Sequence, residues 1–71
     1  MTALVVNGEP REVPEAATVA TLLEHLAVRT PRVAVEINGH VVKRDDYPRR
    51  ALAEGDRVEI VAFVGGGSGA A

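Results

Sequence analysis

The 71-residue sequence contains no cysteine and no tryptophan, and its two aromatic residues are Tyr47 and Phe63. Without cysteine, and with His25 and His40 as its two histidines, it can form no disulfide and offers no ligand set for structural zinc. A chain of this length forms one small domain, which leaves little room for a deep catalytic cleft. An enzyme is therefore the least expected class of function.

An excess of one charge and long apolar runs are also absent. Ten acidic and eight basic side chains give a net charge of −2. Proteins that bind nucleic acid usually carry a basic excess and stacking aromatics, so we expect no nucleic-acid partner. The apolar runs are far shorter than the ~20 residues that span a membrane. No basic residue precedes the short run Ala3–Val6, as it would in a signal peptide. We therefore expect a cytoplasmic protein without a membrane partner.

Side chains capable of acid–base or metal chemistry are present but are not arranged for it. Neither His25 nor His40 has a serine or cysteine nucleophile beside it in the sequence. Asp45-Asp46 lacks the additional oxygen ligands that a hard cation needs. Lys43-Arg44 and Arg49-Arg50 form a basic cluster that the aspartates partly neutralise, which favours a solvated loop, with a rim for an acidic protein partner as the alternative. We expect no bound cofactor and no metal.

One helix and several strands are predicted from the apolar spacing. Thr18–Val28 has apolar residues at i, i+3, i+4 and i+7, and Thr18 can cap its N-terminus. Asn7-Gly8 and Asn38-Gly39 are typical of tight hairpin turns. Arg44–Ala53 is polar and irregular, with room for a single helical turn. The expected strands are Leu4–Val6, Glu9–Val13, Val33–Ile37, His40–Lys43 and Arg57–Val64.

The order strand, strand, helix, strand, strand, strand predicts an α+β domain. In this fold class one helix packs on a small mixed sheet, here of four to five strands. We assign this domain to residues 1–64. Residues 65–71 hold four of the seven glycines and no large side chain, so we expect a flexible glycine-rich tail.

The last predicted strand has two apolar faces. Val58, Ile60, Ala62 and Val64 share the face expected to supply the core, and Val61 and Phe63 lie on the other face. One helix can cover one side of the sheet, so we expect Val61 and Phe63 to be partly exposed, together with Val5 if its strand is adjacent. Such a patch is typical of a protein-binding surface. The alternative is that the loop 44–53 folds over it.

The glycine-rich tail admits two interpretations. It can be a frayed terminus or a leftover linker. It is not a phosphate-binding loop, because no helix and no Lys-Ser/Thr pair follows it. It can also be a reactive arm, since a peptide without side chains fits a narrow channel in a partner enzyme. A terminal glycine carboxylate is unshielded and can be activated as an acyl adenylate.

Residues 1–67 resemble the ThiS family of sulfur carriers in thiamine (thiazole) biosynthesis, within the ubiquitin-like β-grasp superfamily. The most specific element is the strand Gly-Asp-x-Val-Glu-Ile-Val running into Phe-Val-Gly-Gly-Gly. The resemblance implies a β-grasp fold. The matching segments are Leu4–Gly8, Thr18–Leu23, Val33–Asn38, Val42–Arg44, Gly55–Val61 and Phe63–Gly67.

The resemblance also implies a function and a set of partners. An E1-like adenylyltransferase, using ATP and Mg²⁺, activates the C-terminal glycine of such a carrier. Sulfur from a cysteine desulfurase persulfide then replaces AMP, and thiazole synthase takes the sulfur from the resulting thiocarboxylate. The carrier itself is not an enzyme. By position, Gly67 would bear the sulfur and Gly66 would precede it, and the partner enzymes would contact Val61, Phe63, Val64 and Gly65.

The sequence departs from the family at its end, because members end at the glycine pair whereas Ser68–Ala71 follow Gly67 here. Gly67 therefore lacks a free carboxylate, and we expect a JAMM-type metalloprotease to remove residues 68–71. The alternatives are an unprocessed natural extension or residues foreign to the natural protein. Rival functions are the small subunit of molybdopterin synthase, with the same chemistry, a ubiquitin-like modifier linked through Gly67, and a non-covalent binding module.

Overall fold

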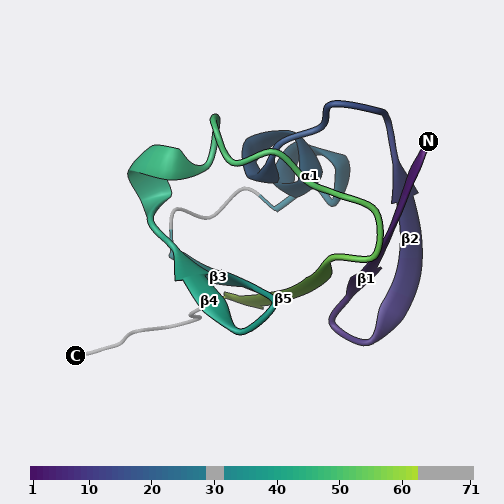
Figure 1. Cartoon of the computed structure of the whole chain (residues 1–71). Helices are drawn as coiled ribbons and strands as arrows, with labels where there is room; N and C mark the ends of the chain where they lie inside the picture. The colour runs from purple at the N-terminus through teal and green to yellow at the C-terminus, as the bar shows by residue number, and fades with distance from the viewer. Residues whose placement is uncertain (29–31, 63–71) are drawn as a thin grey trace.

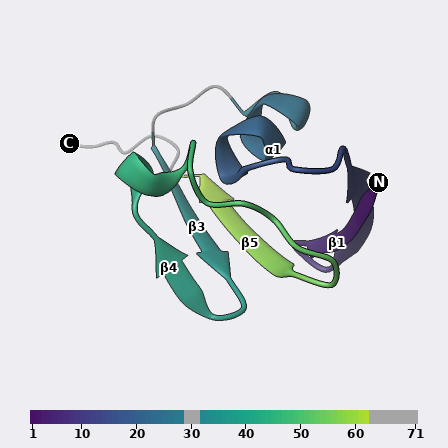
Figure 2. The same cartoon turned by 45° about the horizontal axis from the view of Figure 1, so that its top comes forward.

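A computed structural model describes residues 1–28 and 32–62, which form one α-helix on a five-stranded mixed sheet (Figures 1 and 2). The strand order is β2-β1-β5-β3-β4, with β1 and β5 parallel and the other neighbours antiparallel. The predicted α+β architecture is confirmed. In chain order the elements are β1 (Thr2–Val6), β2 (Glu9–Val13), α1 (Val19–His25), β3 (Val33–Ile37), β4 (His40–Val42), the 3₁₀ turn η1 (Arg44–Asp46) and β5 (Arg57–Ala62).

Both asparagine–glycine pairs form two-residue hairpin turns, as predicted. Asn7 and Gly8 have φ of 49° and 83°, and Asn38 and Gly39 have φ of 54° and 84°. Positive φ at both central residues defines the type I′ turn, whose twist matches that of the flanking strands. The turns fix the register of β1 against β2 and of β3 against β4.

The helix begins as predicted but ends early. The Thr18 hydroxyl accepts the backbone N–H of Thr21 at 3.3 Å, which caps the N-terminus. The helix ends at His25 rather than at the predicted Val28, because Ala27 takes a left-handed conformation with φ 59°. The N–H groups of Ala27 and Val28 bond back to helix carbonyls in the pattern of a Schellman cap. Such a cap usually has glycine at this position, and the sequence has alanine.

The loop 44–53 packs on the helix side of the sheet, and its polar appearance in the sequence was misleading. Tyr47 and Leu52 are 8% and 7% exposed and belong to the core. The N–H of Val19, the first helical residue, donates to the Arg50 carbonyl at 3.0 Å. The loop thus supplies a partner for a helix N–H that has none inside the helix.

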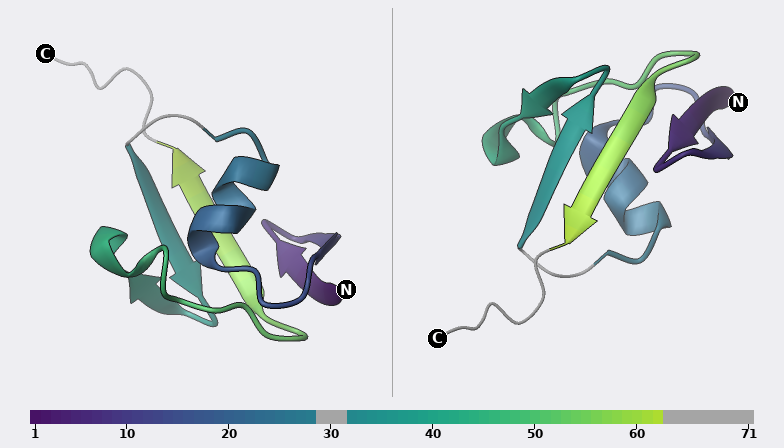
Figure 3. Two further views of the ribbon diagram at one scale, coloured as in Figure 1. Left: turned by 90° about the horizontal axis from the view of Figure 1, so that it is seen from above. Right: turned by 90° about the horizontal axis from the view of Figure 1, so that it is seen from below.

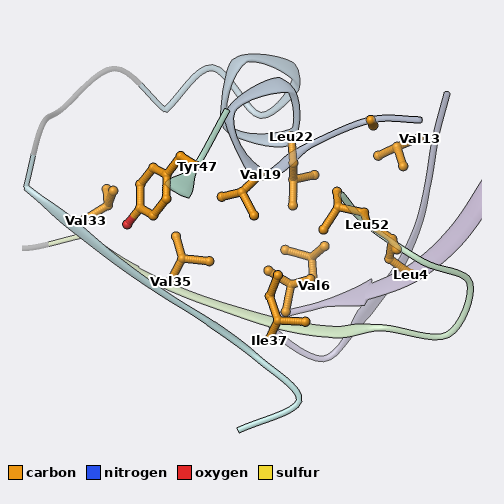
Figure 4. Packing of buried hydrophobic residues seen from close by; sticks show 12 residues of the cluster. Leu4, Val6, Val13, Val19, Leu22, Val33, Val35, Ile37, Tyr47 and Leu52 are labelled. Carbon is orange, nitrogen blue, oxygen red and sulfur yellow. The ribbon is translucent and has the colours of Figure 1, made fainter. Parts of the chain in front are cut away.

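The core lies between α1, this loop and the helix-facing side of the sheet (Figure 4). Alternate residues of the strands point into it, as expected for a sheet with one covered face. Val58 of β5 is buried, Ile60 is half-buried and Ala62 is exposed, so the core thins toward the end of β5. The buried apolar residues are Leu4, Val6, Val13, Ala17, Val19, Leu22, Val33, Val35, Ile37, Tyr47, Leu52 and Val58.

Candidate functional site

Of the residues predicted to carry or surround the reactive end, Val61 is the one that the structure describes. Phe63, Val64, Gly65, Gly66 and Gly67 lie outside the described residues, as do residues 68–71 and the predicted boundary between domain and tail. The site is therefore built from the strand that leads to these residues, β5, and from the contacts that hold it.

β5 presents Val61 on the face of the sheet that the helix leaves uncovered. The Val61 residue is 53% exposed, and it lies opposite half-buried Ala34 of β3. Val5 of β1 is also half-buried and lies beside Arg57 of β5 in the register. Figure 3, right, shows the strands in front of the helix in the view from below. The loop 44–53 packs on the other side, so the expected exposure of Val61 is confirmed.

Two carboxylates lie in the middle of this uncovered face. Glu36 of β3 and Glu59 of β5 are directly paired in the antiparallel register, and both are exposed. Like charges directly opposite each other destabilise a sheet. The face combines exposed valines at Val41 and Val61 with this acidic pair, so it is amphipathic rather than purely apolar.

The Asn7 side chain holds the last part of β5 in place. The pairing of β1 with β5 ends at Val6 and Val58, but the Asn7 amide extends it. Its Oδ1 accepts the Ile60 N–H at 2.7 Å, and its Nδ2 donates to the Ile60 carbonyl at 3.1 Å. A hairpin turn thereby fixes both backbone groups of a residue two positions before the end of the strand.

A buried aspartate holds the start of β5 in a similar way. Asp56 is 7% exposed, and its Oδ2 accepts the Ala53 N–H at 2.9 Å. Its Oδ1 accepts from Asn38 Nδ2 at 3.1 Å, and Asn38 Oδ1 accepts the Arg57 N–H at 3.0 Å. Among the described residues no buried side-chain polar atom lacks a partner. Side chains from the two hairpin turns, Asn7 and Asn38, therefore bond the backbone of β5 at Ile60 and at Arg57.

The remaining polar candidates lie on the surface. His25 and His40 are exposed. Arg49 pairs with Asp46 at 3.4 Å, which partly neutralises the basic cluster. Within residues 1–28 and 32–62, no group of three or more His, Asp or Glu side chains is placed to hold a metal ion. No helix in the same ranges is long and apolar enough to cross a membrane.

Residues 4–67 match the ThiS family. The chain belongs to the ThiS family. It is 40% identical over 62 residues to the sulfur carrier protein ThiS of Thermus thermophilus, covering 87% of this chain and 95% of that protein. The crystal structure of a thiamine biosynthesis protein, ThiS, from Geobacter metallireducens superposes with a TM-score of 0.79 at 39% identity, covering 93% of this chain and all of that one.

Two longer proteins also match this ThiS chain. It is 48% identical over 65 residues to a thiazole synthase of Paramagnetospirillum magneticum and 42% identical over 62 residues to one of Magnetococcus marinus. The chain spans about a fifth of the length of these two proteins, 20% and 19%, although the matches cover 92% and 87% of the chain itself.

Sequence reasoning missed the residues that fix β5 within this ThiS chain. Asn7 and Asn38 were interpreted as turn formers, and their side-chain bonds to a distant strand were not expected. One available signal is that both turns use asparagine where the turn type also accepts aspartate or glycine. The burial of Asp56 depends on contacts with Asn38, 18 positions away in the sequence, that no local pattern shows.

Proposed function

We propose that this chain is a sulfur carrier of thiamine biosynthesis that bears sulfur as a thiocarboxylate on Gly67. The observation that carries the proposal is the continuous ThiS match over residues 4–67, whose last residue is Gly67 itself. The names of the similar proteins, a sulfur carrier and two thiazole synthases, support the thiazole branch over the molybdopterin branch.

The chemistry takes place on the backbone carboxylate of Gly67. That carboxylate attacks the α-phosphorus of ATP in an E1-like adenylyltransferase, which supplies the Mg²⁺, and pyrophosphate leaves. Persulfide sulfur from a cysteine desulfurase attacks the acyl adenylate and AMP leaves. A thiol then attacks the desulfurase cysteine sulfur of the resulting acyl disulfide, which forms a disulfide with that cysteine and releases the thiocarboxylate. Thiazole synthase takes this sulfur into the thiazole ring. Because the chain belongs to a family of sulfur carriers, we propose that it is a co-substrate rather than an enzyme and that it acts in the cytoplasm.

The described part of the chain acts as the handle that presents the reactive end. Asn7 and Asp56 fix β5, so the chain enters the tail from a defined place and direction. Val61 offers an exposed apolar contact at the end of the same strand. We propose that the partner enzymes bind Val61 together with Phe63, Val64 and Gly65, while Gly66 and Gly67 enter the partner's active site.

Residues 68–71 must be removed before Gly67 can be activated, because a peptide bond leaves no carboxylate there. We propose that a protease, of the JAMM metalloprotease type, cleaves after Gly67. Intact-mass measurement of the protein from its native cell tests this step. A chain ending at Gly67 is the expected product, and a full-length species with no trimmed or thiocarboxylated form contradicts it.

The partner proposal has a separate test. We expect the trimmed chain to co-purify with thiazole synthase and with the adenylyltransferase. Co-purification with the large subunit of molybdopterin synthase instead would move the protein to the other pathway. Isopeptide-linked adducts on denaturing gels would indicate a protein modifier. Thiamine-independent growth with Gly66 and Gly67 deleted would indicate a binding module whose tail is inert.

A further inference from the structure

The basic charge of this molecule is concentrated in one segment. Residues 43–50 hold four of the eight Lys and Arg side chains but two of the ten Asp and Glu side chains. The segment therefore carries a net charge of +2 in a chain whose total is −2. This concentration of basic side chains gives a positively charged region beside the edge strand β4, whereas the rest of the chain is net acidic. A positively charged region attracts acidic ligands at long range.

A hollow lies between this segment and β4. It has a volume of about 620 Å³, within the range of ligand-binding pockets. We call it the β4 groove and define it by Ile37 and Val42, which are apolar, and by the polar residues around them. Those polar residues are Asn38, His40, Lys43, Asp46, Arg49 and Arg50, with Val41 at the strand edge.

Several hydrogen-bond donors around the β4 groove make no bond to residues 1–28 or 32–62. Arg49 uses one nitrogen for Asp46 and for the Asp45 carbonyl, at 3.4 and 3.3 Å. Arg50 donates to the Ala51 carbonyl through one nitrogen. A guanidinium has five N–H donors, so each arginine keeps several. Lys43 makes no ion pair with the described residues. Among the residues that line the groove, Asp46 carries the negative charge, and Lys43, Arg49 and Arg50 carry positive charges.

β4 also presents unpaired backbone groups along the β4 groove. Ile37 and His40 close the two-residue hairpin, and the closing pair of such a turn exchanges both backbone hydrogen bonds. The next pair, Glu36 and Val41, is then the non-hydrogen-bonded one. The N–H and C=O of Val41 therefore point away from β3, at the edge of the sheet, and the Val41 residue is 71% exposed.

The two edges of the sheet differ in how they are protected. On β2, Pro10 occupies the position that Val41 occupies on β4, one residue beyond a closing pair and opposite Val5. At this position the backbone N–H would point outward from the sheet edge, and proline has none. Another strand therefore cannot pair with β2 there. β4 has no such block. Its three-residue length limits how many backbone bonds a partner can form, so side-chain charges must add affinity.

We propose that the β4 groove binds an extended acidic segment of a partner protein. The segment adds a short strand to β4 through Val41, which is one of the recurring modes of peptide recognition. Its carboxylates bind Lys43, Arg49 and Arg50, and an apolar side chain contacts half-buried Val42. The proposal does not depend on sulfur transfer, because the groove lies at the opposite edge of β3 from β5.

Charge reversal tests the electrostatic half of the proposal. The probe is a blocked peptide of alternating glutamate and valine, titrated into the ¹⁵N-labelled full chain. We expect amide shifts at residues 40–50 and binding that weakens with salt. Lys43→Glu with Arg50→Glu should weaken binding at least about tenfold. The matched control, Arg11→Glu with Arg57→Glu on other strands, should leave the affinity within about twofold. Equal loss in both variants contradicts the site.

The proposed strand pairing through the Val41 backbone needs a different variant. Val41→Pro removes the outward N–H without breaking the bonds to β3, whereas Val41→Ala keeps it. We expect Val41→Pro to lose peptide binding and Val41→Ala to keep it. If Val41→Pro unfolds the protein, hydrogen exchange on the unmodified chain decides. The Val41 amide should become protected when the peptide binds. An amide that exchanges equally fast in the complex, or tighter binding of a single-stranded RNA oligonucleotide than of the peptide, overturns the proposal.

Discussion

At the scale of single residues, three polar side chains fix β5, the strand that leads to the proposed sulfur-bearing residue Gly67. Asn7 bonds both backbone groups of Ile60, and Asn38 and Asp56 bond each other and the backbone around the start of β5. Each asparagine also forms its hairpin turn at positive φ. Asparagine thus has two roles here: it forms the local turn, and its side chain bonds a residue more than 15 positions away in the sequence.

The first prediction separates these two roles of Asn7. Asn7→Gly keeps the turn, because glycine accepts positive φ, but removes both bonds to Ile60. We expect the free energy of unfolding, measured with urea, to fall by about 1–2 kcal/mol. The Ile60 amide should also exchange faster with solvent. Gly8→Asn, which changes the neighbouring turn residue without touching β5, is the control, and equal exchange at Ile60 in both variants would refute the role assigned to Asn7.

At the scale of elements, the predictions from sequence succeeded where the pattern is periodic and failed where tertiary contacts decide. Thr18 and the alternating apolar residues of Val33–Ile37 located a helix start and a strand. The helix end was placed too late because Ala27 carries no glycine signal for its left-handed backbone. Tyr47 and Leu52 were missed as core residues because their loop has no period, and its position depends on bonds to the helix.

The second prediction follows from the helix end. Ala27 has φ 59°, which costs an L-residue roughly 1 kcal/mol or more. Ala27→Gly removes that strain, although glycine also loses more freedom on folding. We expect a net gain in unfolding free energy of about 0.5–1 kcal/mol. Ala20→Gly, inside the helix, should instead cost about 0.5–1 kcal/mol. Urea titration of both variants checks this, and a loss at Ala27 would be inconsistent with the Schellman cap.

The third prediction concerns the acidic pair on the uncovered face. Glu36 lies directly opposite Glu59, so Glu36→Lys replaces a repulsion by an attraction. We expect the unfolding free energy to rise by about 0.2–1 kcal/mol at low salt. The gain should shrink as salt is added, because both side chains are exposed. The control is Glu12→Lys, whose strand partner is Ala3. A similar gain in the control would assign the effect to net charge alone.

At the scale of the whole molecule, the two faces of the sheet differ, because one packs against the core and the other is left uncovered. The helix and the loop 44–53 cover one face of the sheet, and the other face presents Val61 beside the residues that lead to Gly67. The glycines and the family motif predict a reactive end at Gly67, which lies outside the described residues. The sequence could not show how β5 is fixed, because the contacts of Asn7 and Asp56 come from residues distant in the chain.

The fourth prediction tests the contact role of Val61. Val61→Asp places a charge on a 53% exposed position, so the unfolding free energy should change little. Thiocarboxylate formation by the adenylyltransferase, at carrier concentrations below saturation, should slow by about tenfold or more if this side chain is a central contact. Pro10→Asp, at an exposed position on the same face but at the β2 edge, is the matched control and should leave the rate unchanged. Equal rates for both variants would remove Val61 from the partner surface.

Sulfur transfer through this chain depends on the proposed role of Gly67 as the residue that bears the sulfur. The most direct measurement is mass spectrometry of the chain ending at Gly67 after incubation with ATP, the adenylyltransferase and a sulfur source. We expect one oxygen to be replaced by sulfur, and fragmentation to localise the change to Gly67. An unchanged mass under conditions in which the same enzymes load another ThiS carrier, or sulfur at any other residue, would contradict it.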